Sequence, residues 1–288
     1  MIDEISTLSP ARRTERLMKE LERLPAEPTA AMRLLWTVDD ADSSADDLGS
    51  VVATDPGLTT RIMKMANSAY YGLSGKVQSS AFAITILGFS AVRTLAAAAA
   101  AGALGQERSV PDGFWAHAAA TAAGAALVAS RVGAPRNEAF SLGLLHDLGR
   151  ALLHRVDAAE SANIDAAARA GDVTLLNAER ASFGIDHADA AARVLEAWRF
   201  PPAFVEAIRD HHSDQRPVTA PLTRALVAGE ALATLADEGV AVRESGHGAS
   251  ELEAIVVEVG GLAPGEIEGC TMQLRREADA LAGSFLLA

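Results

Sequence analysis

The sequence is poor in cysteine, and its N-terminus does not predict a secretory signal peptide. Cys270 is the one cysteine among 288 residues, so no disulfide can form within the chain. This usage fits a reducing cytosol. Asp3 and Glu4 precede any apolar run, which is unlike a secretory signal peptide. We therefore expect a cytoplasmic protein.

Positive charge is also scarce, with 25 Lys and Arg against 38 Asp and Glu and a net charge of −13. Nucleic-acid backbones and anionic membrane surfaces both require a positive surface, so neither is expected as a partner. The uncharged run 113–130 is nearly long enough to cross a bilayer. Because it is mostly alanine and contains His117, we predict a buried helix there instead.

No segment sustains the alternation of polar and apolar residues that is typical of a β-strand, and no fixed-period repeat is present. Apolar residues recur instead at helical spacing, as Leu17, Leu21 and Leu24 do. With 49% hydrophobic residues, the chain can bury a large core as one or two domains. The sequence predicts an all-α protein.

The clearest internal boundary is a charged segment that ends in Val110-Pro111-Asp112-Gly113 and separates residues 1–105 from residues 106–288. Before it, the stretch 79–105 is predicted to be helical with an interruption near Gly88. After it, the pattern predicts helices near 114–131, 137–155, 158–170, 173–182, 187–198, 202–212, 219–236, 250–260 and 264–286.

A polar pair interrupts one of these apolar segments, in the stretch Gly-Leu-Leu-His-Asp-Leu-Gly-Arg at residues 143–150. Leucines recur there every four residues, which predicts a single helix over 137–155. His146 and Asp147 would lie in the middle of that helix. Such side chains belong on the surface unless they have partners, and both are strong metal ligands.

Two glycines flank the polar pair, and glycine is a poor helix former. Gly143 and Gly149 would each destabilise a helix interior by about 1 kcal/mol relative to alanine. We therefore expect another element or a ligand to approach the backbone closely at these positions.

Further histidines and a carboxylate lie on neighbouring predicted helices. Side chains on consecutive helices of a bundle can converge on one interior point, which is how bundle metal sites are made. Imidazole and carboxylate together suit Zn, Fe, Mn or Ni. Two such ions could clamp a phosphate and activate a water for phosphoester hydrolysis. The candidates besides His146 and Asp147 are His117, His187, His211, His212 and Glu230.

Each candidate also has a simpler interpretation when it is taken alone. His117, on an alanine-rich face, could be a hydrogen-bonded core residue. His211 and His212 close a helix, where an imidazolium interacts favourably with the helix dipole. Glu230, on an amphipathic helix, would be a surface residue, and Asp186 would be an N-cap that needs no metal.

The order of these residues resembles the HD superfamily of helical metal-dependent phosphohydrolases. It is more closely similar to the HDOD family, the HD-related output domain of bacterial signalling proteins. The resemblance covers roughly residues 20–235. The motifs that carry it, besides the ordered histidines and the stretch 143–149, are Leu24-Pro25-Ala26-Glu27-Pro28, Asp55-Pro56-Gly57-Leu58-Thr59, Ala66-Asn67-Ser68-Ala69-Tyr70-Tyr71-Gly72, Ala83-Ile84, Leu87-Gly88-Phe89-Ser90-Ala91-Val92-Arg93, Glu179 with Phe183-Gly184, and Trp198-Arg199-Phe200-Pro201.

The resemblance implies an HD-like multi-helix bundle with a smaller N-terminal helical lobe at 1–105 and an HD-like lobe with C-terminal helices at 106–288. It implies a regulatory module of bacterial signal transduction that binds a signalling protein or a small ligand, without catalysis. Carried over from the two-metal branch of the superfamily, the ligands of one or two divalent transition-metal ions would be His117, His146, Asp147, His187, His211, His212 and Glu230.

Two departures from that branch bear on catalysis. Arg150 stands where the similar cyclic-dinucleotide phosphodiesterases have a lysine, and still offers a cationic phosphate contact. The phosphodiesterases' signature after the double histidine is replaced by residues 213–217, Ser-Asp-Gln-Arg-Pro, so cyclic-dinucleotide hydrolysis is not expected. The alternative to a regulatory module is a metal-dependent phosphohydrolase of phosphoesters or nucleotides, with Asp147 and Arg150 in the catalytic site.

Overall fold

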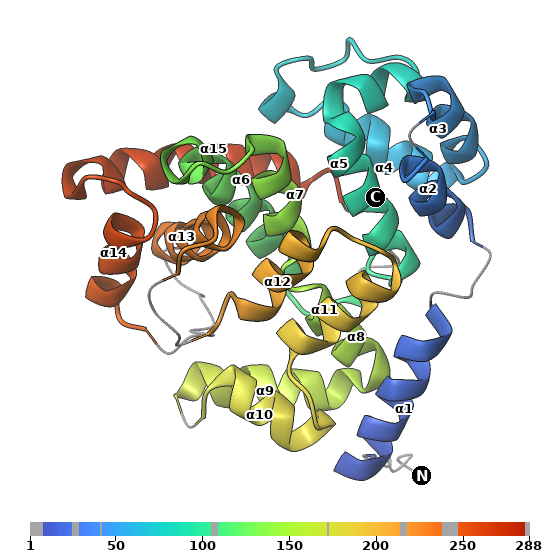
Figure 1. Cartoon of the computed structure of the whole chain (residues 1–288). Helices are drawn as coiled ribbons and strands as arrows, with labels where there is room; N and C mark the ends of the chain where they lie inside the picture. Colours follow the sequence, from blue (N-terminus) through green and yellow to red (C-terminus); the bar gives the residue numbers. More distant parts are fainter. Residues whose placement is uncertain are drawn as a thin grey trace, which may run out of the picture.

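The structure is a computed structural model, which describes residues 8–24, 29–40, 42–104, 109–171, 173–213, 218–237 and 247–285. Throughout these residues the chain forms helices and no β-strand, which confirms the all-α prediction (Figure 1). Residues 105–108, at the predicted division of the chain, lie outside the described residues.

The N-terminal lobe is a group of four helices that pack on one another (Figure 1). At each N-terminus a serine, threonine or aspartate side chain accepts a backbone N–H three residues later, and this satisfies a donor that the helix itself leaves unpaired. Buried leucine, isoleucine and methionine side chains fill the space between the helices. The helices are α2 (Ala30–Val38), α3 (Ala45–Val52), α4 (Pro56–Ala66) and α5 (Ser80–Ala100).

The predicted interruption of α5 is confirmed at Gly88, whose φ of 78° and ψ of 159° fall in a region that only glycine adopts readily. Of the helices described, α5 is the one long and apolar enough to cross a membrane, and 56% of its apolar window is buried within the fold. It contacts α2, α3 and α4, and also a helix of the second lobe.

The second lobe is a larger bundle that surrounds an alanine-rich helix, α6 (Phe114–Val132). Most of α6 is buried, which confirms the prediction for residues 113–130. The backbones of α6 and α13 approach so closely that a Cβ at Gly124 would lie 2.6 Å from the Gly229 carbonyl oxygen. The remaining helices are α7 (Arg136–Leu145), α8 (Leu148–Val156), α9 (Ala158–Ala170), α10 (Leu175–Phe183), α11 (His187–Ala197), α12 (Pro202–Asp210), α13 (Pro221–Ala236), α14 (Ala249–Glu258) and α15 (Ile267–Ala282).

The prediction of one continuous helix over 137–155 is wrong in its middle. α7 ends before His146, and α8 begins after Asp147, whose φ of −94° and ψ of 11° are not helical. The His146 Nδ1 atom donates to the Gly143 carbonyl oxygen at 2.7 Å, so a side chain takes the acceptor that a backbone N–H would use. The polar pair therefore lies at a break between two helices.

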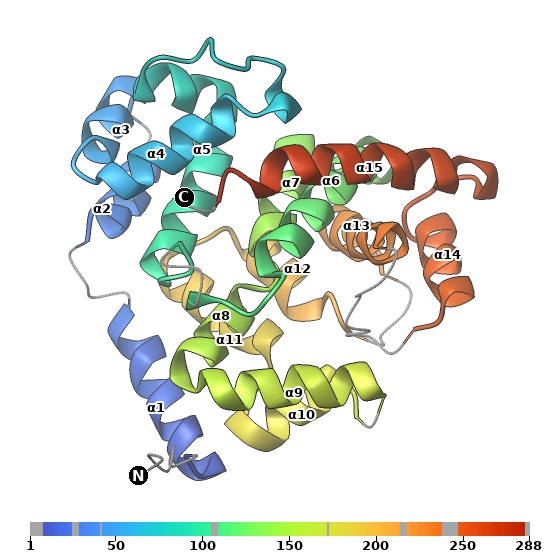
Figure 2. The ribbon, with the colours of Figure 1, turned by 180° about the vertical axis from the view of Figure 1, so that it is seen from behind.

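The first helix, α1 (Pro10–Arg23), contacts the second lobe although it precedes the N-terminal lobe in the sequence. Both views show it beside α8 and apart from α2–α5 (Figures 1 and 2). Arg13 is 4% exposed and pairs with Asp157 at 2.9 Å and with Glu160 at 3.0 Å. The buried guanidinium of Arg13 thus bridges two carboxylates and fixes α1 to the start of α9.

Candidate metal centre

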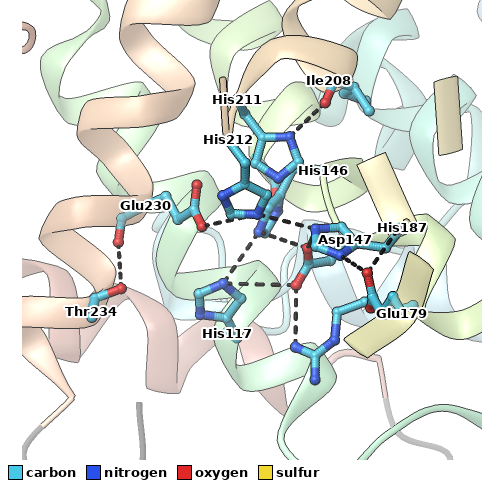
Figure 3. A network of polar contacts seen from close by, with 12 residues as sticks. His117, His146, Asp147, Glu179, His187, Ile208, His211, His212, Glu230 and Thr234 are labelled. Atoms are coloured by element: carbon cyan, nitrogen blue, oxygen red, sulfur yellow. Dashed lines mark hydrogen bonds and ion pairs between the residues drawn. The ribbon is translucent and has the colours of Figure 1, made fainter. Parts of the chain in front are cut away.

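All seven predicted ligands lie close together in the interior of the second lobe (Figure 3). Five parts of the bundle contribute them, and each part enters from a different side. His117 is on α6, His146 and Asp147 form the break between α7 and α8, His187 begins α11, His211 and His212 follow α12, and Glu230 is on α13.

Close backbone approach at the two glycines beside the polar pair brings these elements together. A Cβ on Gly149 would lie 1.9 Å from the His187 carbonyl oxygen, and a Cβ on Gly143 would lie 2.5 Å from Ala122 Cα. Both distances are well below van der Waals contact. Glycine therefore lets α11 and α6 reach the α7–α8 break, as expected from the sequence.

Two of the imidazoles are oriented by backbone carbonyl groups. The Nδ1 atom of His146 donates to Gly143, as described above, and the Nδ1 atom of His211 donates to the Ile208 carbonyl oxygen at 2.5 Å. A proton on Nδ1 leaves the lone pair on Nε2, the nitrogen that faces the centre. Such hydrogen bonds to the far nitrogen are the usual means of aiming a metal-ligating histidine.

A third imidazole is oriented by a buried carboxylate that sequence reasoning did not assign to the site. Glu179, 3% exposed, accepts the Nδ1–H of His187 at 2.7 Å and the backbone N–H of the same residue at 2.9 Å. The signal was its place eight residues before His187 in the HDOD-like pattern. That spacing crosses a helix end and a turn, so it did not by itself predict contact.

The ligand atoms form two groups. The first joins Asp147, His187, His211 and His212, and the second joins His117, His146 and Glu230; within each group the ligand atoms lie within 4.8 Å of one another. The Oδ1 atom of Asp147 is 3.4 Å from the His187 Nε2 and 3.5 Å from the His146 Nε2. Asp147 thus lies between the groups, where a carboxylate could serve two ions.

The polar atoms at the centre fit a divalent metal. Both carboxylate oxygens of Asp147 and the Nε2 of His211 are buried without a hydrogen-bond partner among the described residues. Leaving buried polar atoms without hydrogen bonds is unfavourable by several kcal/mol in order of magnitude. A cation with imidazole and carboxylate ligands, of the Zn, Fe, Mn or Ni type, would satisfy all three atoms.

The charge states at neutral pH also suit a metal. Burial, reinforced by the imidazoles of His146 and His187, lowers the pKa of His211 to about 3. Burial likewise lowers the pKa of His117 and His212. Burial alone would raise the pKa of Asp147, but the surrounding imidazoles and Arg150 hold it well below its usual value. The neutral imidazoles of His117, His211 and His212 and the ionised carboxylate of Asp147 are the forms that bind metals.

Arg150 lies next to the centre but is engaged by carboxylates. It donates to Asp165 at 2.8 Å, and its guanidinium is 3.5 Å from the Oδ2 atom of Asp147. Asp165 is 5% exposed, and nothing local in the sequence of α9 indicated this role. Arg150 therefore braces the ligand Asp147 as well as bordering the centre.

Two clefts reach the centre. One has a volume of about 590 Å³ and is lined by His117 and Arg150 together with Phe114 and Leu274. The other, of about 370 Å³, is lined by His212 and Glu230, among others. The His117 side chain is 27% exposed, whereas those of His146 and His187 are completely buried. Access to the centre therefore passes along His117 on one side.

The simpler interpretations of single residues have mixed outcomes. Asp186 does cap α11, as predicted, by accepting the backbone N–H of Asp189 at 2.9 Å. The surface position suggested for Glu230 is wrong, because its side chain is 12% exposed and lies 3.8 Å from the His212 Nε2. The imidazolium suggested for His211 and His212 is also wrong at neutral pH, because burial lowers both pKa values.

The architecture is shared with several solved bacterial proteins. A candidate phosphohydrolase from Shewanella amazonensis SB2B is 25% identical, with a TM-score of 0.70 over 94% of this chain and 98% of its own. A candidate signal transduction protein from Marinobacter aquaeolei VT8 is also 25% identical, with a TM-score of 0.67 over 98% of this chain and 67% of its own. An HDOD domain protein of unknown function from Geobacter sulfurreducens, 21% identical, has a TM-score of 0.66 over 93% of this chain and 98% of its own.

Sequence comparison gives a consistent result. An uncharacterised protein of Treponema pallidum (strain Nichols) is 20% identical in an alignment of 204 positions, which covers 67% of this chain and 38% of that protein. The chain thus matches well under half of this relative's length. The HDOD domain family matches residues 24–214, from the end of α1 to just after the double histidine. Since this match spans more than half of the sequence, the chain belongs to the HDOD family.

Proposed function

We propose that this chain is a cytoplasmic regulatory module of bacterial signal transduction, which holds a divalent transition metal and acts by binding a protein partner or a small ligand. In this proposal the metal stabilises the second lobe and shapes the surface that the partner or ligand contacts. Catalysis is not part of the role.

The observation that carries the proposal is the pairing of Arg150. In the phosphohydrolase alternative, Arg150 was the residue expected to contact the phosphate in addition to the metal ions. Its guanidinium instead donates to Asp165 and faces Asp147, so two carboxylates offset its single charge.

Membership of the HDOD family supports the regulatory role, as does similarity to a structure named as a candidate signal transduction protein. The single cysteine fits a reducing compartment. The cleft of about 590 Å³ has the size of a small-ligand site and borders the centre at His117. A small ligand bound there would contact the metal-holding residues directly.

The second candidate is a metal-dependent phosphohydrolase acting on a phosphoester or nucleotide. It is favoured by the two groups of ligand atoms with Asp147 between them, and by similarity to a structure named as a candidate phosphohydrolase. Two bound ions would polarise a phosphate and activate a water. His117 would border the substrate from the cleft, while Asp165 would keep Arg150 beside Asp147.

Turnover measurements separate the two candidates. Protein without a histidine tag, loaded in turn with Mn, Fe and Zn, would be assayed on a panel of phosphoesters and nucleotides beside Asp147→Asn. We expect no turnover above the level of the variant. Turnover that disappears in Asp147→Asn would establish the phosphohydrolase and overturn the regulatory proposal. A thermal shift with a panel compound, in the absence of turnover, would support ligand binding.

A further inference from the structure

Arg93 joins the N-terminal lobe to the segment that leads into α12. It lies on α5, and its guanidinium pairs with Asp39 at the end of α2, at 2.5 Å. The same group donates to the carbonyl oxygens of Trp198 at 3.3 Å and Arg199 at 2.8 Å. It also lies over the ring of Phe200, 4.3 Å from the centroid. One side chain thus holds three consecutive residues between α11 and α12.

The backbone that Arg93 holds is in an unfavourable conformation. Arg199 has a φ of 57°, and among the described residues it is the one residue other than glycine with a positive φ. A residue with a side chain is disfavoured there because its Cβ crowds the carbonyl oxygen. Surrounding contacts must stabilise this turn, and the hydrogen bond from Arg93 to its carbonyl is the shorter of the two backbone contacts.

The turn sets the position of two metal ligands. Pro201 and Pro202 follow it and begin α12, which has no glycine and buries Phe204, Val205, Ala207 and Ile208. His211 and His212 come directly after α12, and the Ile208 carbonyl orients the His211 ring. A rigid helix therefore transmits a displacement of its first residue to the double histidine.

We propose that Arg93 is a positioning residue for the metal centre: by holding the Trp198–Phe200 turn, it makes metal affinity depend on the docking of the N-terminal lobe. The proposal rests on the metal centre proposed above. It gives the N-terminal lobe, which contributes none of the seven candidate ligands, an effect on metal binding. A change in how the N-terminal lobe packs would therefore change the metal affinity of the group Asp147, His187, His211 and His212.

The test compares Arg93→Gln with Arg131→Gln. The control removes an arginine that pairs with Glu266 between α6 and the start of α15 and that contacts neither the turn nor a ligand. Zinc affinity is measured by competition with a chelator, and amide hydrogen exchange is followed over residues 201–212 without metal. We expect Arg93→Gln to bind zinc about tenfold more weakly. We also expect faster exchange in α12, and parental values for the control.

The two measurements keep the outcomes distinct. Arg93→Gln with zinc affinity and exchange of α12 equal to the control would overturn the inference. A parent that binds no zinc would overturn the proposed metal centre, and exchange would then decide whether Arg93 holds α12. If Arg93→Gln does not fold, Arg93→Lys keeps the charge but cannot contact both carbonyl oxygens and Asp39 together. A zinc affinity of Arg93→Lys that is below the parental value supports the inference, and a parental affinity overturns it.

Discussion

Glu179 holds His187 by two hydrogen bonds, accepting both the imidazole Nδ1–H at 2.7 Å and the backbone N–H at 2.9 Å. One carboxylate thus fixes the ring and the backbone at the N-terminus of α11. Glu179 and His187 are both almost completely buried, so water does not compete for these bonds. A carboxylate behind a ligating imidazole also makes the ligand more basic.

Glu179→Gln should therefore weaken metal binding without removing a ligand. The amide cannot supply the negative charge that increases the basicity of His187, so we expect affinity to fall by about 10- to 100-fold. Competition with a chelator measures the change. Glu196→Gln is the matched control, because Glu196 pairs with Arg209 at the surface. Equal affinity in the two variants would show that Glu179 does not support the ligand.

Gly149→Ala should disrupt the contact between α8 and α11. The new Cβ would lie 1.9 Å from the His187 carbonyl oxygen, so one of the two helices must move. We expect the free energy of unfolding, measured with urea, to fall by about 3 kcal/mol. Gly269→Ala, with nothing within 4 Å of its Cβ and within α15, should instead gain about 0.5–1 kcal/mol. Equal effects would contradict the close approach.

The metal-free protein should lose stability as the pH falls below 6.5. The pKa of His211 is about 3 in the folded protein and near 6.5 when unfolded, so between these values the unfolded chain binds the extra proton. Stability therefore rises with pH across that window, by about 1.4 kcal/mol per pH unit for each such histidine. Urea unfolding with a chelator present, from pH 4 to 7, should give a shallower slope for His211→Gln. The same slope in parent and variant would refute the assignment.

Arg13→Met should detach α1 from the second lobe. The substitution leaves Asp157 and Glu160 without their cation in a poorly hydrated place, and we expect a loss of about 2 kcal/mol in the free energy of unfolding. Lys19→Met removes an exposed ion pair of the same helix and should leave stability unchanged. If both variants were as stable as the parent, the pairing of Arg13 would not hold α1 in place.

Most of the helices and the set of candidate ligands could be predicted from the sequence. Apolar spacing marked most of the elements, and the family-like order of the histidines indicated that His117 and Glu230 would meet at one centre. Gly149 indicated that another element approaches the backbone closely, but its position in the sequence did not identify α11 as that element. These features are local, or depend on residue order, and so can be predicted without coordinates.

Features that depend on tertiary contacts could not be predicted in this way. At the break the His146 imidazole, and not a backbone N–H, binds the Gly143 carbonyl oxygen, and the leucine spacing on both sides gave no sign of this. The pairing of Arg150 with Asp165 joins two helices, and the hydrogen bond from Arg93 to the Arg199 carbonyl oxygen joins two lobes. In each case the partner is chosen by the packing of elements that are far apart in the sequence.

The most direct test of the account is the metal content of the purified protein. Protein made without a histidine tag would be analysed by elemental mass spectrometry, as isolated and after reconstitution with Fe, Mn, Zn or Ni, beside Asp147→Asn. The account predicts about one to two equivalents of a transition metal in the parent and a clear loss in the variant, which lacks the carboxylate between the two groups. Less than about a tenth of an equivalent in the parent after reconstitution would contradict it.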